Sequence, residues 1–183
     1  MIQCIYLTSR AGRIRLKRWY DPKLSSKDKR RFIKEVNNLV LSRDDKLCNF
    51  VDYRDLRVVY KRYASLYFVC ITDYEDNELS TLETIHFFVE LLDNYFGNVC
   101  ELDIIYNVKS VSIKNKKAYN VLDEFILNGE VYETNKSLII GTLLNMDSID
   151  FENERSTKKM GLIQRKILSR KLNKIGKSLD DEN

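Results

Sequence analysis

The residues that could do acid–base chemistry in this sequence are few, and they lie together on one predicted helix. His86 is the only histidine of the chain, and Glu83, Glu90 and Asp93 recur around it at helical spacing. A histidine that acts as a general base needs a nucleophile to deprotonate and a group that orients its ring. Nothing in the sequence ties such groups to His86, and charges at this spacing are typical of a solvated helix face. We therefore expect no catalytic site.

The cysteines and glycines show no pattern that would bind a metal ion or a nucleotide phosphate. The four cysteines are far apart and form no CxxC pair, at Cys4, Cys48, Cys70 and Cys100. With only one histidine to complete a ligand set, a zinc site is not expected. The six glycines form no GxGxxG sequence and no phosphate-binding loop. We expect no cofactor, and the cysteines are typical of reduced core thiols in a cytosolic protein.

Positive charge is the chemical feature that stands out on one predicted strand. The basic residues Arg13, Arg15 and Lys17 alternate with Ile14 and Leu16. Successive side chains of a strand point to opposite faces, so one face of this strand is strongly basic. A basic strand face is unusual without a ligand or partner, and it indicates binding of a negatively charged group.

The remaining positive charge is concentrated near the C-terminal end. The chain of 183 residues has a net charge of +4. Residues 155–183 hold nine Lys or Arg and three acidic residues, a net charge of +6, which leaves −2 for residues 1–154. The body is nearly neutral, which argues against a nucleic-acid binder. We expect one folded domain over residues 1–147 and a basic, flexible extension over residues 148–183.

Apolar periodicity predicts an antiparallel sheet built around one hairpin. The stretch LRVVYKRYASLYFVCIT at Leu56–Thr72 is the densest in β-branched and aromatic residues, and it contains no Gly or Pro. A reversal is expected over the polar pair Lys61 and Arg62 and the small pair Ala64 and Ser65, with the hairpin in the middle of the sheet. Further strands are predicted to give about five in all, at Ile2–Leu7, Ile14–Tyr20 and Asn49–Tyr53.

Helical periodicity predicts that helices cover this sheet. A first helix, capped by Ser25 or Ser26, runs to about Leu41. The capping box formed by Ser80 and Glu83 begins a longer helix that ends at Gly97. Shorter helices are expected over 98–105, around Leu122, Phe125 and Ile126 before Gly129, and after a Thr134 cap, with Leu138, Ile139, Leu143 and Leu144 facing inward. Residues 109–117 are predicted to form an exposed basic loop. The fold class is therefore α+β.

Four stretches of the sequence together resemble one protein family, the small (sigma) subunits of the clathrin adaptor complexes. They are SRAGRIRLKRWY, FVDYRDLRVVYKRYASLYF, DNELSTLETIHFFVELLDNYFGNVCELDIIYN and AYNVLDEFILNGEVYETN. They occur in order and cover roughly residues 1–145. The likeness is greatest to the sigma subunit of adaptor protein complex 1, with the plasma-membrane complex as the near alternative. It implies a longin-like fold, which agrees with the order of strands and helices predicted above.

The resemblance implies a role in vesicle transport without enzymatic activity. A sigma subunit assembles with a large, a medium and a second large subunit into a heterotetramer. Such a complex selects the cytosolic tails of transmembrane cargo and engages clathrin indirectly. It implies a cytoplasmic protein that is peripheral on trans-Golgi network and endosome membranes and on coated vesicles, with no nucleic-acid partner.

The resemblance also implies a site for acidic dileucine signals, [DE]xxxL[LI], formed together with the large subunit. Carried over by position, the leucine pockets involve Tyr63, Ala64, Leu66, Val89, Asn98, Val99 and Ile104, with Arg15 near the acidic residue. The chemistry is coherent, because leucines need concave apolar pockets and an acidic side chain needs a cation. Periodicity alone would instead place Leu66, Val89, Val99 and Ile104 in an ordinary core.

Two segments depart from the family pattern, and two other protein classes fit the sequence less well. The lysine-rich stretch 109–117 is an insertion, and the basic extension is not the usual family ending. A longin-type SNARE would need a long heptad segment and a membrane anchor after residue 150. A basic-tailed RNA binder would rest on charge alone, because no aromatic stacking face accompanies the basic run.

Overall fold

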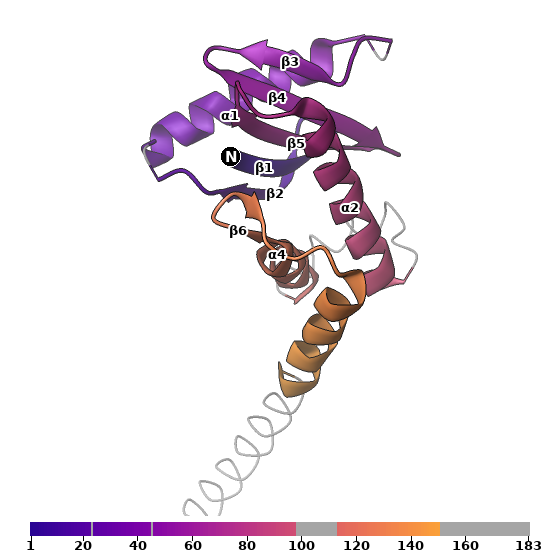
Figure 1. Ribbon diagram of the computed structural model, residues 1–183. Coiled ribbons are helices and arrows are strands. Elements are labelled where there is room, and N and C mark those ends of the chain that lie inside the picture. Colours follow the sequence, from indigo (N-terminus) through magenta and orange to yellow (C-terminus); the bar gives the residue numbers. More distant parts are fainter. Residues whose placement is uncertain (23, 45, 98–112, 151–183) are drawn as a thin grey trace, which may run out of the picture. The chain divides into compact units, whose positions relative to one another are not determined.

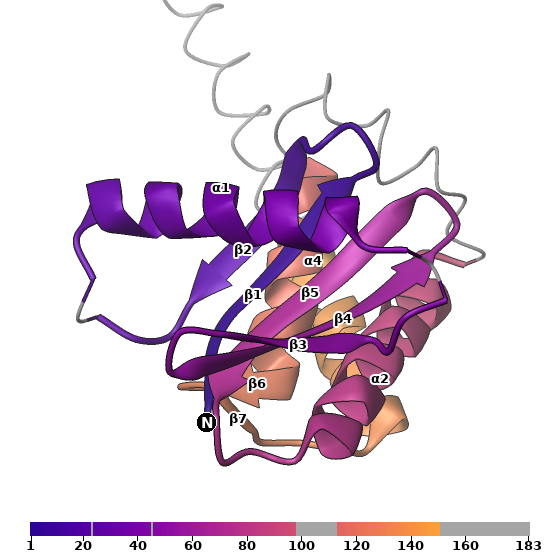
Figure 2. The same ribbon diagram turned by 90° about the horizontal axis from the view of Figure 1, so that it is seen from above.

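The computed structural model describes residues 1–22, 24–44, 46–97 and 113–150. Its main feature is a five-stranded antiparallel sheet with the strand order β2-β1-β5-β4-β3 (Figure 1). The strands are β1 (Ile2–Ser9), β2 (Ile14–Trp19), β3 (Phe50–Tyr53), β4 (Leu56–Tyr63) and β5 (Leu66–Asp73). Helices lie on both sides of this sheet (Figure 2). The predicted α+β fold, an antiparallel sheet flanked by helices, is confirmed.

The β4–β5 hairpin lies inside the sheet, as its composition predicts. β5 is the middle strand, paired with β1 on one side and with β4 on the other. Seven of its eight residues are buried, which explains why apolar residues run through it without alternation. Tyr63 pairs with Leu66, so the predicted reversal is confirmed only for Ala64 and Ser65, which form a two-residue turn. Lys61 and Arg62 belong to β4 and pair with β5, so the prediction is wrong for them. Ala64 has a φ of +53°, in the left-handed region that favours glycine.

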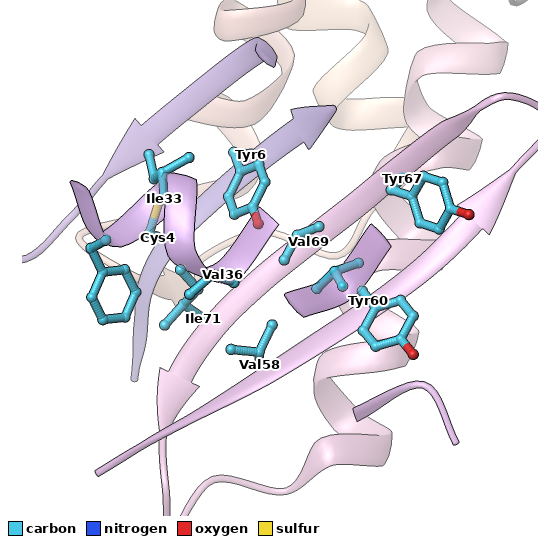
Figure 3. Packing of buried hydrophobic residues seen from close by; sticks show 11 residues of the cluster. Cys4, Tyr6, Ile33, Val36, Val58, Tyr60, Tyr67, Val69 and Ile71 are labelled. Carbon is cyan, nitrogen blue, oxygen red and sulfur yellow. The ribbon is translucent and has the colours of Figure 1, made fainter. Parts of the chain in front are cut away.

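One face of the sheet is covered by α1 (Ser26–Ser42). The Ser25 side chain caps this helix by accepting a hydrogen bond from the Asp28 amide at 3.2 Å, as predicted. Its apolar stripe is Phe32, Ile33, Val36 and Val40. This stripe packs on strand residues that point to the same side, namely Cys4, Tyr6, Val58, Tyr60, Tyr67, Val69 and Ile71 (Figure 3). The cluster is the hydrophobic core between α1 and the sheet.

The opposite face carries α2 (Glu78–Phe96). The ring centroids of Phe68 on β5 and Phe88 on α2 are 6.1 Å apart there. Phe68 points to this face because successive strand residues alternate between the two faces. The predicted Ser80–Glu83 capping box is wrong, because Asn77 is the N-cap. Its side-chain oxygen accepts from the amides of Leu79 and Ser80 at 2.9 and 3.2 Å, so the helix begins before Ser80. The predicted end at Gly97, which has a φ of +66°, is confirmed.

After the gap in the described residues, the chain forms α4 (Ile113–Phe125) and a small hairpin that the sequence did not predict. The basic loop predicted over 109–117 is wrong for residues 113–117, which belong to α4, while 109–112 lie outside the described residues. The helix ends at Phe125 and not at Gly129. Strands β6 (Ile126–Leu127) and β7 (Glu130–Val131) follow instead, joined by Asn128 and Gly129.

The β6–β7 turn is bound closely to the first strand. The Ile2 amide donates to the Gly129 carbonyl at 2.8 Å. Gly129 has a φ of +84°, and a Cβ atom at this position would lie 2.3 Å from the Ile2 carbonyl oxygen. Only glycine fits such a contact between two backbones.

The last described helix covers residues 136–150, and the first compact unit, Met1–Ile140, ends within it. Asn135, and not the predicted Thr134, begins it, because the Asn135 side chain accepts from the Leu138 amide at 3.2 Å. Ile139 and Leu143 are buried as predicted, whereas Leu138 and Leu144 are each 55% exposed. No helix in the described part of the chain is long and apolar enough to cross a membrane. The helix predicted over 98–105 and nearly all of the extension predicted over 148–183 lie outside the described residues.

The cysteines fall into two classes. Cys4 and Cys70 are buried free thiols, and burial raises the pKa of both well above the ordinary value. Cys48 is exposed, so the prediction that all cysteines are core thiols is wrong for this residue. Cys100 lies outside the described residues.

Candidate functional site

The first part of the candidate site is the turn between β4 and β5. Tyr63 and Leu66 are cross-strand partners that flank this turn. Leu66 is only 2% exposed, so it is a core residue that can form the floor of a pocket but not its rim. Ala64, at the tip, is exposed and has a methyl group as its whole side chain. Three predicted site residues are therefore brought together by one tight turn.

The second part is contributed by α2. The Tyr63 hydroxyl lies 3.1 Å from His86 Nδ1, and the two rings are nearly parallel, with an interplanar angle of 6° and centroids 6.3 Å apart. Val89 follows His86 by three residues, which places both on neighbouring turns of the same helix side. Val89 is half-buried. The helix thus brings Val89 to the end of the sheet where Tyr63, Ala64 and Leu66 lie.

Arg15 lies at the same end of the sheet but on another strand. The Arg10 amide donates to the Ser65 carbonyl at 3.2 Å, which joins the β1–β2 turn to the β4–β5 turn. In β2, Arg15 sits at a register shift, between Ile14 and Leu16, which pair with consecutive residues of β1. Its side chain is half-buried. Three strand spacings, or roughly 14 Å, separate β2 from β4.

The guanidinium of Arg15 has a donor that is not used within the described residues. Its Nε atom is shielded from solvent and has no hydrogen-bond partner there. A buried donor without an acceptor typically destabilises a protein by about 1–3 kcal/mol. This atom is therefore a position where an additional acceptor would be favourable.

The structure thus assembles five of the eight predicted site residues at one end of the sheet. Tyr63, Ala64, Leu66 and Val89 form one group, and Arg15 stands apart from them. Asn98, Val99 and Ile104 lie outside the described residues. No group of His, Cys, Asp and Glu side chains in the described ranges could hold a metal ion.

A hollow of about 370 Å³ next to the same turn was not foreseen from the sequence. It opens on the α1 side, and Ala64 is the residue it shares with the predicted site. It is lined by Val40, Arg43, Asp44, Leu47, Asn49, Tyr60, Lys61, Arg62, Ala64 and Tyr67. The Arg43 guanidinium is held in its wall by the Tyr60 hydroxyl at 2.8 Å and the carbonyls of Cys48 and Phe50 at 3.2 and 3.4 Å. Periodicity could not indicate this hollow, because three separate segments form it.

Comparison with known proteins gives a consistent result. The family model of the clathrin adaptor complex small chain matches residues 1–150. AP-1 complex subunit sigma-2 of Dictyostelium discoideum is 49% identical over 145 residues, which are 79% of this chain and 89% of that protein. Human AP-1 complex subunit sigma-1A is 47% identical over 154 residues, 84% of this chain and 92% of that protein.

The fold is found in an assembled adaptor as well. A chain in a homology model of the full-length AP-3 complex, in a stretched open conformation, superposes with a TM-score of 0.60. It is 26% identical in sequence, and the match covers 85% of this chain and 99% of that one. The order of strands and helices, the four sequence stretches and these relatives agree, and the chain belongs to the family of clathrin adaptor complex small chains.

Proposed function

We propose that this chain is the sigma subunit of a heterotetrameric adaptor complex 1, which selects transmembrane cargo with acidic dileucine signals at the trans-Golgi network and endosomes. Its partners are a large, a medium and a second large subunit, and it reaches clathrin and the membrane through that complex. The identity of 47–49% to AP-1 sigma subunits supports this assignment. The role is binding, with no enzymatic activity and no cofactor.

The cargo proposal rests on the distance across the sheet between Arg15 on β2 and the Tyr63 turn on β4. In the signal [DE]xxxL[LI], the first leucine lies four positions after the acidic residue. An extended chain advances about 3.4 Å per residue, so four residues span roughly 14 Å. This equals the distance of three strand spacings from Arg15 on β2 to the Tyr63 turn on β4. A signal lying across the end of the sheet can therefore reach both groups at once.

The chemistry of the two ends fits the two parts of the signal. A carboxylate next to Arg15 would pair with the accessible part of its half-buried guanidinium, and charge-assisted hydrogen bonds of this kind are the stronger ones. At the other end, the small Ala64 leaves space above Leu66, and half-buried Val89 supplies an apolar wall. Leucine side chains are stabilised by such a surface by about 1.5–3 kcal/mol each when fully buried.

The spacing can be tested with peptides on the reconstituted four-chain complex. Three peptides would carry the acidic residue two, four or six positions before the first leucine, and a fourth would have both leucines replaced by alanine. We expect the four-residue spacing to bind best, with the other two weaker by about tenfold, the size of one charged hydrogen bond. Equal binding of the three spacings, or of the alanine peptide, would contradict the proposal.

The compartment is a separate part of the proposal. The plasma-membrane endocytic adaptor is the alternative, and the AP-1 relatives favour the trans-Golgi complex over it. Affinity capture of the tagged chain from cells, followed by identification of stoichiometric partners, distinguishes them. Recovery of the large subunits of the endocytic complex would overturn the assignment to complex 1.

A further inference from the structure

The single histidine of the chain forms a side-chain contact that the proposed function does not yet use. His86 Nδ1 and the Tyr63 hydroxyl are 3.1 Å apart, although the residues lie 23 positions apart in the sequence. The Tyr63 ring is held between two others: it stacks on His86, and it meets Phe68 edge to face at 5.5 Å and 85°. Tyr63 is therefore fixed both by its ring faces and by its hydroxyl group.

The charged groups around this pair come from three elements. On α2 itself, Glu90 Oε1 lies 4.0 Å from His86 Nε2. From the segment that follows β7, Lys136 Nζ donates to Glu90 Oε2 at 2.7 Å, and this hydrogen bond is the main cause of a lowered pKa of the Glu90 carboxyl. From β4, Lys61 Nζ lies 5.3 Å from the centre of the Tyr63 ring. Glu90 is thus engaged by Lys136, which leaves Tyr63 as the close hydrogen-bond partner of His86.

We propose that His86 is a positioning residue of the cargo site. Its Nδ1 atom accepts a hydrogen bond from the Tyr63 hydroxyl group, which fixes the Tyr63 ring as a wall of the leucine pocket. This inference rests on the proposed function, because it assigns a role to His86 at the same site. His86 itself is 43% exposed and is not needed to fill the core, so its contact with Tyr63 is the main restraint it applies.

The physical reason is the local freedom of the chain at the turn. Tyr63 is the last residue of β4 and precedes Ala64, whose positive φ places the backbone in a sparsely populated region. A terminal aromatic residue next to such a turn keeps rotamer freedom unless a second group holds it. A ring that is already in place does not lose this freedom when the signal binds, which improves affinity without any new contact.

The test uses the four-chain complex and an acidic dileucine peptide with the four-residue spacing. His86→Leu removes the acceptor, and Tyr63→Phe removes the donor. His86→Asn keeps an acceptor, since Asn Oδ1 lies close to the position of His Nδ1. Glu83→Gln, on the same helix, is the matched control. We expect His86→Leu and Tyr63→Phe each to weaken binding about fivefold, the size of one hydrogen bond, and the double variant to be no weaker than either. His86→Asn should restore most of the affinity.

The outcomes separate this inference from the proposed function. Wild-type affinity of His86→Leu, failure of His86→Asn to restore binding, or a double variant weakened by the product of the two single effects would each overturn the role of His86. Thermal unfolding of each assembled variant, unchanged from wild type, shows that the loss is local. If the wild-type complex binds the dileucine peptide no better than its alanine version, the proposed function fails, and the inference fails with it.

Discussion

Two tight turns of this protein each contain a residue with positive φ but differ in what surrounds them. The β6–β7 turn at Asn128 and Gly129 is pressed against the first strand, where a Cβ atom would lie 2.3 Å from the Ile2 carbonyl oxygen. The β4–β5 turn also has a positive φ, at Ala64, but there the Ala64 side chain is exposed, and the nearest reported backbone bond runs from the Arg10 amide to the Ser65 carbonyl at 3.2 Å. A tight turn can therefore serve to close a fold or to leave space for a ligand, depending on what packs against it.

The residue types at the two turns reflect this difference. At the enclosed turn, only glycine satisfies both the positive φ and the close backbone. At the open turn an alanine occupies a position that favours glycine, so the methyl group has been kept despite a cost of about 1 kcal/mol. Residues in sparsely populated backbone regions cluster at binding sites, which agrees with the proposed leucine pocket.

The largest effect is expected from Val89→Asp, which should abolish binding of dileucine peptides to the assembled complex. A carboxylate next to an apolar pocket costs several kcal/mol if it stays ionised, roughly the whole binding energy of a weak peptide. Val89 is only half-buried, so we expect the variant to fold and the assembly still to form. Peptides with tyrosine-based signals are the control and should bind as before. Unchanged affinity for dileucine peptides in the folded variant would remove Val89 from the site.

Gly129→Ala tests the enclosed turn, and we expect it to lower the free energy of unfolding by roughly 2–4 kcal/mol. Two controls separate the causes. Gly97→Ala has a similar positive φ of +66° but open space around it, so it should show only the backbone cost, about 1 kcal/mol. Gly141→Ala, in a helix and also in open space, should be neutral or slightly stabilising. Urea unfolding of the three variants, each bound to the large subunit, measures their losses of unfolding free energy. Equal losses for Gly129→Ala and Gly97→Ala would show that the close contact with Ile2 is unimportant.

Arg15→Ser is expected to have an intermediate and selective effect. It removes the guanidinium with the unused Nε donor, so peptides with the acidic residue should bind about five- to tenfold more weakly. Peptides already lacking that residue should lose almost nothing, because the leucine pocket is unchanged. Isothermal titration of both peptides to wild-type and variant complexes measures the difference. A similar loss for both would mean that Arg15 supports the fold and does not contact the signal.

The smallest effect should come from Ala64→Gly, and its direction is informative. Glycine adopts the positive φ freely, while it also increases the entropy of the unfolded chain, so we expect a gain in stability of only about 0.5 kcal/mol. Binding of dileucine peptides should become slightly weaker, because the methyl group is lost from the pocket. Ser65→Gly, at the neighbouring residue, is the control, and it should not combine a gain in stability with weaker binding of dileucine peptides. A gain in both stability and affinity would contradict the role of the Ala64 methyl group.

The sheet was predictable because its pattern repeats along many residues. The density of apolar residues in Leu56–Thr72 identified the central hairpin, and the spacing of Phe32, Ile33, Val36 and Val40 identified the face of α1 that forms the core. Features that depend on one or two residues were missed. Strands β6 and β7 have two residues each, too few for any periodicity, and an asparagine cap at Asn77 competed with a good capping box at Ser80.

The candidate site was less accessible to sequence reasoning than the fold. The concentration of basic residues near Arg15 was visible in the sequence, but the single basic strand face was not obtained, because Arg13 lies outside β2 and a register shift at Arg15 interrupts the alternation. The distance of Arg15 from the Tyr63 turn depends on strand order, which places β1 and β5 between β2 and β4. The contact between His86 and Tyr63 joins two elements and leaves no trace in either local pattern. The leucine-binding roles of Tyr63, Ala64, Leu66 and Val89 came from family resemblance and stay predictions.

The position of β1 in the sheet has a consequence for synthesis of the protein. β1 pairs with β5, so Ser9 can pair only after Leu66 has been synthesised, and Ile2 only after Thr72. At about 5–20 residues per second, a ribosome takes roughly 3–14 seconds to produce the intervening chain. During this time the apolar strand IQCIYLTS is paired only with β2, and its other edge is open to aggregation. Long-range pairing of this kind also slows folding itself. Until β5 emerges, the open edge of β1 can therefore pair with other chains.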